Sequence, residues 1–294
     1  MTMNRRQFTR GLLLAPGLAP LFADAAGNDS TLAARLAKIE RASGGRLGVC
    51  IFDMATDRRV GHREHDRFPM CSTFKLLAAA AVLARVDQGR DALDSRVVIQ
   101  PADLLPNSPV TQARVGGAGM TVAQLCEAAI TVSDNAAGNL LLVRLGGPSG
   151  VTDFARSLGD PHTRLDRNEL ALNESLAGDP RDTTTPDAMV GNLQKLLLGN
   201  ALSAESREQL LQWLDANQTG AKRLRAGLPL DWQVGDKTGS GQNGTTNDVA
   251  ILRPPGRLPM LVSAYLTATP AASNARNATL AAVGAAVAAS VRAA

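Results

Sequence analysis

The sequence is short of the residues on which metal and disulfide chemistry depend. It has three histidines and three cysteines among 294 residues. The histidines form neither a His-Glu-x-x-His helix nor a cysteine–histidine cluster, so we expect no catalytic metal. The cysteines are odd in number, lack Cys-x-x-Cys spacing and lie in apolar surroundings, so we expect small buried hydrophobes and at most one disulfide. They are Cys50, Cys71 and Cys126.

Aromatic residues and net charge are also scarce. Aromatics make up 3% of the chain while Ala and Leu are abundant, which favours a helical, aliphatic core. The formal net charge is only +4, and no basic run follows the first ten residues. We therefore expect neither a nucleic acid nor a membrane surface as a partner. The length is enough for one large domain or two interlocked ones.

The N-terminus resembles an export signal rather than a membrane span. Asn4-Arg5-Arg6-Gln7-Phe8 is a twin-arginine pattern, residues 11–22 are moderately apolar and broken by two prolines, and Ala23-Asp24-Ala25 is a small-x-small cleavage motif. This stretch is too short and interrupted to cross a bilayer. We expect residues 1–25 to be a twin-arginine signal peptide that sends the folded protein to the periplasm. Its removal takes away three arginines and one aspartate and lowers the formal charge from +4 to +2.

The rest of the chain is organised around Ser72-Thr73-Phe74-Lys75 and the uncharged apolar run at 76–84. Strong helix formers without charge predict a helix buried on nearly every side. Ser72 would lie at its N-terminus, where free N–H groups favour an alkoxide or an oxyanion. Lys75 would follow one turn later on the same face and, once desolvated, could exchange a proton with the hydroxyl. Taken alone, the tetrapeptide is more simply interpreted as an N-cap serine and a snorkelling lysine, so the catalytic interpretation depends on the rest of the chain.

Strand patterns lie near both termini. A helix is expected from Asp29 or Ser30 to Ala42, a strand at 47–53, and a returning strand from Arg58. Further strands are expected at 231–241, 247–252 and 260–268, before an alanine-rich helix from about Ser273.

The middle of the chain, from 68 to about 217, has helical patterns. A Thr121–Gln124 capping box predicts a helix as far as Val132, and a second helix is expected from Ala136 to Leu145. Strands at both ends with helices between them predict an α+β fold. Residues 26–66 and 217–294 would form an antiparallel sheet domain, residues 67–216 an inserted all-α domain, and the cleft between them the functional site.

Two motifs would face Ser72 in that cleft. Ser133-Asp134-Asn135 connects two predicted helices and is by itself a plausible capping loop, but beside Ser72 it offers a proton-relaying hydroxyl and a substrate-orienting amide. Residues 236–241 end a predicted strand, on which Thr238 and Ser240 share a face and two glycines leave the backbone open to a ligand. Lys237 would lie on the opposite face as a positive field. An edge strand blunted by a lysine is the plainer interpretation.

The polar stretch 167–182 has the length of an Ω-loop, and an Arg167–Asp182 ion pair would close its neck. Glu169 and Asn173 are four residues apart, so one helical turn would aim both at one point, where they could hold and deprotonate a water. Solvated loop charges are the alternative.

These motifs, Ser-x-x-Lys, Ser-Asp-Asn, Glu-x-x-Leu-Asn and Lys-Thr-Gly, resemble in order and separation those of the class A serine β-lactamases. The likeness covers nearly all of the chain after the signal. It implies a five-stranded antiparallel sheet flanked by the terminal helices, an inserted all-α domain, a monomer, and no cofactor. It also implies hydrolysis of the β-lactam amide of penicillins and cephalosporins, and hence antibiotic resistance.

The resemblance also implies a role for each motif residue. Ser72 attacks the lactam carbonyl, with the backbone N–H groups of Ser72 and Ser240 as the oxyanion hole, and Ser133 protonates the departing nitrogen. Lys75 and Glu169 share the base role in acylation, an assignment that is disputed for the family. The remaining roles are water activation by Glu169 with Asn173, binding of the substrate's side-chain amide by Asn135, and binding of its carboxylate by Lys237, Thr238 and Ser240.

The sequence departs from the family in three places. No arginine follows the Lys-Thr-Gly strand, and Arg223 aligns with an arginine that anchors the substrate carboxylate in some relatives. Asn107 stands where an aromatic usually lines the lip of the cleft. Cys71 and Cys126 lack the cysteines with which they would pair, because Gly241 and Ala79 stand there, so carbapenem hydrolysis is not supported. The Ser240-Gly241 pair is similar to enzymes that accept oxyimino-cephalosporins.

Two other functions use similar parts. A DD-peptidase acylates in the same way but releases β-lactams very slowly, and a β-lactam sensor binds without turnover. Glu169 and Asn173 argue against the peptidase, because that pair brings water to the acyl carbonyl. A sensor needs a membrane anchor, and we find none after the export signal.

Overall fold

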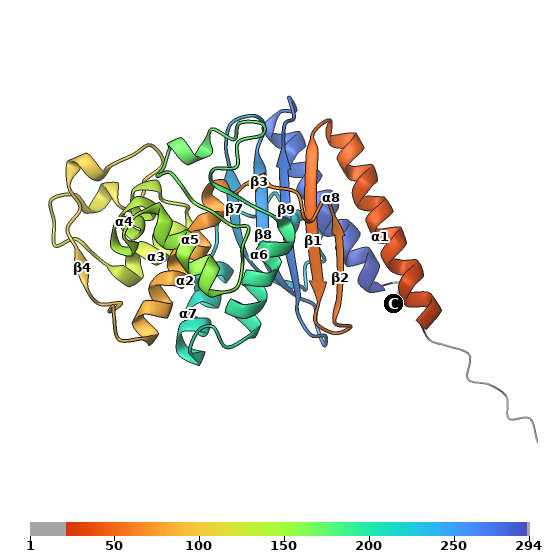
Figure 1. The fold of residues 1–294 in the computed structure, drawn as a ribbon, viewed down its shortest axis with the longest axis horizontal. Helices are drawn as coiled ribbons and strands as arrows, with labels where there is room; N and C mark the ends of the chain where they lie inside the picture. Colours follow the sequence, from red (N-terminus) through yellow and green to blue (C-terminus); the bar gives the residue numbers. More distant parts are fainter. Residues whose placement is uncertain (1–21, 293–294) are drawn as a thin grey trace, which may run out of the picture.

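The computed structural model describes residues 22–292. Figure 1 shows a sheet with the two terminal helices on one side and most of the other helices on the other. The strand order is β2–β1–β9–β8–β7, and all neighbouring pairs are antiparallel. The expected α+β fold with a five-stranded antiparallel sheet is confirmed. Its strands are β1 (Arg46–Asp53), β2 (Arg58–His62), β7 (Gln233–Ser240), β8 (Thr246–Arg253) and β9 (Met260–Thr267).

Both faces of the sheet are buried, which explains why its central strands read as nearly continuous apolar runs. In β1, Val49 and Ile51 pack in one core cluster with the terminal helices α1 (Phe22–Ser43) and α8 (Ser273–Arg292). Cys50 and Phe52, on the opposite face, belong to the larger cluster shared with the inserted helices. The sheet therefore separates two cores.

The inserted segment is mostly helical, as expected, and the capping box at Thr121 and Gln124 is present. Its helices are α2 (Phe74–Asp87), α3 (Val122–Thr131), α4 (Asn135–Leu145), α5 (Pro148–Ser157), α6 (Pro186–Leu193) and α7 (Ala204–Asp215). Short 3-10 turns are η1 (Cys71–Thr73), η2 (Pro101–Asp103), η3 (Gln112–Arg114), η4 (Ala171–Asn173) and, after the insert, η6 (Leu224–Gly227), while η5 (Gln194–Leu198) is a π-helical turn.

Two small antiparallel ladders interrupt this helical segment and were not expected. They are β3 (Phe68–Pro69) with β6 (Thr183–Thr184), and β4 (Arg96–Val97) with β5 (Met120–Thr121). The β3–β6 ladder continues into a bond from Met70 N to Asp182 O (2.9 Å), so it ties the segment before Ser72 to the end of the 167–182 loop. Two-residue strands carry no periodicity that a sequence pattern could reveal.

The start of the first helix was also predicted wrongly. The backbone is helical from Phe22, seven residues before Asp29, although the added segment includes weak helix formers such as Gly27 and Asn28, so local propensity did not indicate this start. Most of the expected signal peptide, residues 1–21, lies outside the described residues, and the expected cut near Ala25 falls in the first turns of α1. Among residues 22–292, no helix combines the length and apolar character that a membrane span requires.

Candidate active site

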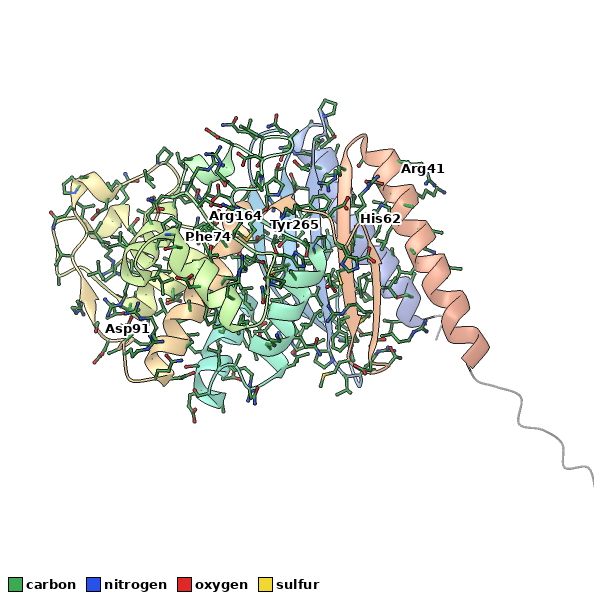
Figure 2. All side chains as sticks on the ribbon, viewed as in Figure 1. Arg41, His62, Phe74, Asp91, Arg164 and Tyr265 are labelled. Atoms are coloured by element: carbon green, nitrogen blue, oxygen red, sulfur yellow. The ribbon has the colours of Figure 1, made fainter. Side chains whose placement is uncertain are left out.

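Ser72 lies in the 3-10 turn η1 that leads directly into α2. Residues 74–84 of α2 are all buried, as the uncharged apolar run predicts, and Figure 2 shows Phe74 and Tyr265 inside the molecule where α2 approaches the sheet. The turn is held from β8, because Asn247 Nδ2 donates to Pro69 O (2.8 Å) and Met70 O (3.0 Å). The hydroxyl of Ser72 is therefore fixed between the sheet and the helices.

Lys75 is the centre of the polar cluster around Ser72. Its Nζ donates to Ser72 Oγ (3.1 Å), Ser133 O (3.0 Å) and Asn135 Oδ1 (2.7 Å), and it lies 2.9 Å from Glu169 Oε1. Burial lowers the pKa of Lys75, although the neighbouring Glu169 carboxylate acts in the opposite direction. A lysine with these contacts can pass a proton between the hydroxyls of Ser72 and Ser133.

Glu169 reaches the same hydroxyl from the 167–182 loop. Ser72 Oγ donates to Glu169 Oε1 (3.1 Å), and Asn173 Nδ2 donates to Glu169 Oε2 (2.5 Å). The two residues converge through the 3-10 turn η4 rather than through the α-helical turn expected from their spacing. Asn173 Oδ1 is buried and has no protein partner among the described residues, so it is free to accept a hydrogen bond from a small molecule beside Glu169.

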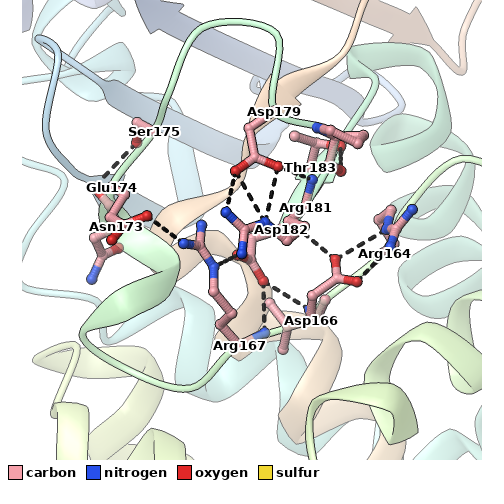
Figure 3. A network of polar contacts seen from close by, with 12 residues as sticks. Arg164, Asp166, Arg167, Asn173, Glu174, Ser175, Asp179, Arg181, Asp182 and Thr183 are labelled. Carbon is pink, nitrogen blue, oxygen red and sulfur yellow. Dashed lines mark hydrogen bonds and ion pairs between the residues drawn. The ribbon is translucent and has the colours of Figure 1, made fainter.

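The neck of this loop is a network of ion pairs and backbone bonds, drawn in Figure 3. Asp182 Oδ2 accepts from Arg167 Nε (2.6 Å), while Asp182 Oδ1 accepts from the backbone N–H groups of Asp166 (2.8 Å) and Arg167 (2.9 Å). Arg167 also pairs with Glu174 (2.5 Å). Because the Asp182 side chain is almost fully buried, this pair is screened little by solvent and closes the loop firmly.

The Ser133–Asn135 loop combines capping with site contacts. Asp134 is the N-cap of α4 and accepts from Ala137 N (2.9 Å). Ser133 has a positive φ of 58°, which turns its side chain toward Lys75 and Lys237. Asn135 is 7% exposed and donates from Nδ2 to Pro106 O (2.8 Å), so one of its amide hydrogens remains for another acceptor.

Strand β7 supplies the opposite wall. Lys237 lies on the face that packs toward η1, where its Nζ donates to Ser133 Oγ (3.0 Å) and Thr238 O (2.9 Å). Burial lowers its pKa well below the usual value, and the cations of Lys75 and Arg223 lower it further. Because Lys237 reaches Ser133 directly, the expectation that it acts from the opposite face as a positive field is wrong. Thr238 contacts Thr219, and Ser240 contacts Arg223. Gly239 faces η1, and a Cβ there would lie 2.7 Å from Met70 O, so no larger residue fits.

Arg223 lies at the end of β7 beside Ser240. Its guanidinium donates to Gly239 O (2.7 Å), Asn247 O (2.5 Å) and Ser240 Oγ (2.7 Å). No residue of β8 supplies an arginine at this point, and Arg223 fills the space from the segment before η6. The cleft therefore ends in a cation that is hydrogen-bonded to a strand hydroxyl.

Comparison with known proteins decides the family. The family model described as "Beta-lactamase enzyme family" matches residues 31–291. β-Lactamase CTX-M-8 of Citrobacter amalonaticus is 49% identical over 259 residues, which cover 88% of this chain and 87% of that protein. β-Lactamase L2 of Stenotrophomonas maltophilia is 47% identical over 295 residues, with 96% and 97% covered. A solved ancestral (GNCA) class A β-lactamase is 61% identical, with a TM-score of 0.86 and 87% and 98% covered. The chain belongs to the class A β-lactamase family.

In this β-lactamase fold, the cysteines are buried and unpaired. Burial raises the pKa of Cys71 to about 12. Its Sγ would lie 2.6 Å from a Cβ at Gly241. The thiol is thus next to the position at which the family resemblance places a partner cysteine, and it is unpaired because that residue is a glycine.

Asn107, at the expected lip position, is hydrogen-bonded to the Ser133–Asn135 loop. It has a positive φ of 61°, its Nδ2 donates to Ser133 O (3.1 Å), and its carbonyl accepts from Asn135 N (3.0 Å). An asparagine tolerates this left-handed backbone better than most residues.

Sequence reasoning missed three residues that hold this β-lactamase site together. Asn139 binds the Glu169 backbone twice, through Nδ2 to Glu169 O (3.0 Å) and from Glu169 N to Oδ1 (2.9 Å). Its position four residues after Asn135 placed it on the same helix face and could have indicated it. Asn247 and Thr219 had no such signal, because their partners lie far away in the sequence. Within the described residues, no group of three His, Cys, Asp or Glu side chains gathers as a metal site would.

Proposed function

We propose that this chain hydrolyses the amide bond of penicillins and cephalosporins through an acyl-enzyme on Ser72, and so provides resistance to these antibiotics. The supporting observation is the placement of Glu169. Its carboxylate contacts Ser72 Oγ through one oxygen and Asn173 through the other, and the free acceptor Asn173 Oδ1 lies beside it. This arrangement suits a water held next to an ester on Ser72.

Acylation would begin when Ser72 Oγ gives its proton to Lys75 or Glu169 and attacks the lactam carbonyl. The backbone N–H groups of Ser72 and Ser240 would receive the oxyanion. When the C–N bond breaks, the ring nitrogen would take a proton from Ser133, which Lys75 and Lys237 both contact and can supply. Both bases lie within 3.1 Å of Ser72 Oγ, so the geometry supports either in the first step.

Deacylation would run through Glu169. A water between Glu169 and Asn173 would lose a proton to the carboxylate and attack the acyl carbonyl, and Ser72 Oγ would leave as it regains a proton. The Arg167–Asp182 neck would keep Glu169 in position during both steps. The product is the ring-opened acid.

Substrate binding would use both walls of the cleft. Lys237, Thr238 and Ser240 would bind the carboxylate, and Arg223 would replace the missing strand arginine through its contact with Ser240. Asn135 would orient the substrate's side-chain amide with its remaining N–H.

We further propose that residues 1–25 direct twin-arginine export to the periplasm, where the chain acts as a monomer. Residues 67–216 and the sheet part, 26–66 with 217–294, would serve as the two halves of the site, because the former carries Ser72 and Glu169 and the latter carries Lys237 and Arg223. The mass of the chain recovered from the periplasm, with and without both arginines Arg5 and Arg6 changed to lysine, tests the export route.

The function is tested by following benzylpenicillin ring opening by absorbance. The Ser72→Ala variant should show no turnover, whereas the exposed Ser149→Ala variant should match the wild type. Turnover by Ser72→Ala would reject Ser72 as the nucleophile. A wild type that acylates and then stops would favour a DD-peptidase or a sensor.

A further inference from the structure

A second pocket lies at the opposite end of α2 from Ser72. It has a volume of about 500 Å³ and is lined by residues of α2 and α5 together with Ala201. Arg85, in the last turn of α2, lines it thirteen residues after Ser72, which corresponds to about 20 Å along a helix. This pocket is therefore separate from the Ser72 cleft, and the inference below does not depend on the function proposed for that cleft.

The lining of the pocket is mixed, with apolar side chains on one part and polar or charged side chains on the rest. Ala81, Ala84 and Leu158 are buried core residues that line it, and Leu145 and Phe154 are partly buried beside them. Its volume falls within the range of small-molecule sites in proteins, which are mostly apolar with a few fixed polar groups.

Arg85 is the charged group of the lining that adjoins the buried alanines of α2. Its Nη1 donates to Arg144 O (2.9 Å), while its Nε is buried and has no hydrogen-bond partner. In the part of the chain that the structure describes, Arg85 forms no ion pair. Both oxygens of Asp91, which is labelled in Figure 2, are bonded to Arg144. Burial acts to raise the pKa of Asp91, but the bonds from Arg144 and, to a smaller extent, the charge of Arg85 lower it. Arg85 therefore keeps hydrogen-bond donors and positive charge that no protein carboxylate contacts.

The rim adds charge of both signs. Arg90 is exposed and bonds to Gln88. Both residues follow Arg85 closely in the chain and line the pocket with it. Asp153 and Ser157, on α5, are exposed and line the pocket from that helix. The lining thus carries two guanidinium groups and one carboxylate, and its net positive charge favours an anionic ligand.

We propose that this pocket binds an amphipathic monocarboxylate, an aryl or alkyl acid, with its apolar part against Ala81, Phe154 and Leu158 and its carboxylate on Arg85. A guanidinium matches a carboxylate in planar, bidentate geometry, and such a charge-assisted contact is stronger than one between neutral groups. Arg90 contributes attraction at the rim.

The test titrates the whole mature chain, labelled with ¹⁵N, with 2-naphthoate and separately with its neutral isostere 2-naphthamide. Calorimetry gives the dissociation constants, and amide resonances locate the ligand. We expect 2-naphthoate to shift the amide resonances of Ala84, Phe154 and Leu158. We also expect it to bind about tenfold or more tightly than the amide, because only the acid forms a charge-assisted hydrogen bond with Arg85. Equal binding of acid and amide would overturn the proposal. So would shifts confined to Ser72 and Thr238, which would place the acid in the other cleft.

Two variants distinguish the effect of the Arg85 charge from the effect of the pocket's volume on binding. Arg85→Gln should weaken 2-naphthoate binding about tenfold and leave 2-naphthamide binding unchanged, whereas Ala201→Phe, which fills the pocket, should weaken both. Arg114→Gln removes an exposed arginine outside the pocket and should change neither. If Arg85→Gln proves unstable because it loses the bond to Arg144 O, Ala201→Phe still decides: unchanged binding of 2-naphthoate by that variant contradicts the site.

Discussion

Lys75 Nζ lies 2.9 Å from Glu169 Oε1, and both side chains are fully buried. Each charge offsets the cost of burying the other, and each contacts Ser72 Oγ. The two groups proposed as bases thus form one cluster, in which a change to either alters the surroundings of the other.

The coupling of this pair predicts a non-additive effect on stability. Lys75→Met leaves the Glu169 carboxylate buried without its cation, and we expect a loss of about 3 kcal/mol or more in the free energy of unfolding. The double variant Lys75→Met/Glu169→Gln should be more stable than the sum of the single changes predicts, because neither charge is then left alone. Urea unfolding of the four proteins measures the difference, and strict additivity would contradict the coupling. The two variants that lack Lys75 should lose kcat/KM for benzylpenicillin by several orders of magnitude, whereas Glu169→Gln should lose mainly kcat, because its acyl-enzyme accumulates.

Arg223 should affect substrate binding more than chemistry. Replacing it by Gln removes the cation beside Ser240, so we expect KM for benzylpenicillin to rise about tenfold with a smaller change in kcat. Arg257→Gln, which breaks an ion pair with Asp53 away from the cleft, is the control. An unchanged KM in Arg223→Gln, or equal effects of both variants, would assign the carboxylate to other residues.

The neck of the Ω-loop should matter for deacylation. Arg167→Met leaves Asp182 buried without its cation, and we expect about 3 kcal/mol less stability together with an acyl-enzyme that persists longer, because Glu169 is held less firmly. Arg181→Met breaks the neighbouring but exposed pair with Asp179 and should change both properties little. Stopped-flow absorbance and intact mass give the rates of acylation and deacylation, and urea unfolding gives the stability. Equal acyl-enzyme lifetimes in the two variants would show that the Arg167–Asp182 pair does not affect deacylation.

A buried acid below the cleft predicts a pH dependence of stability. Burial and the neighbouring Asp236 raise the pKa of Asp248 well above 3.8, so the folded chain holds a proton that the unfolded chain releases. Its stabilising effect is fully present below pH 3.8 and is lost as pH rises toward the raised pKa, by up to about 1.4 kcal/mol per pH unit. Asp248→Asn has no such proton, so its stability relative to the wild type should rise between pH 4 and pH 7. The exposed Asp231→Asn variant should show no such trend, and a flat difference for Asp248→Asn would refute the assignment.

The sequence predicted those features that lie in short, contiguous patterns. The strands were visible because β1, β8 and β9 are apolar on both faces, and α2 was visible because residues 76–84 lack charge. The four motifs indicated Ser72, Lys75, Ser133 and Glu169, and the structure brings these side chains within hydrogen-bond reach of one another.

What the sequence did not predict depends on contacts between distant residues. The β3–β6 ladder has two residues a side, and Asn247 and Asn139 act on backbone groups 177 and 30 residues away. A helical turn was expected between Glu169 and Asn173, but its 3-10 type, at Ala171–Asn173, and the bonds from Asn139 to the Glu169 backbone were not.

The most direct test of the account is the intact mass of the mature chain mixed with excess benzylpenicillin, sampled while ring opening is followed by absorbance. We predict catalytic ring opening with little adduct for the wild type, and a persistent single penicilloyl adduct on Ser72 for Glu169→Gln, because acylation can still use Lys75 while deacylation lacks its base. A wild type that stalls as an adduct, or a Glu169→Gln variant that releases product as fast as the wild type, would contradict the role given to Glu169.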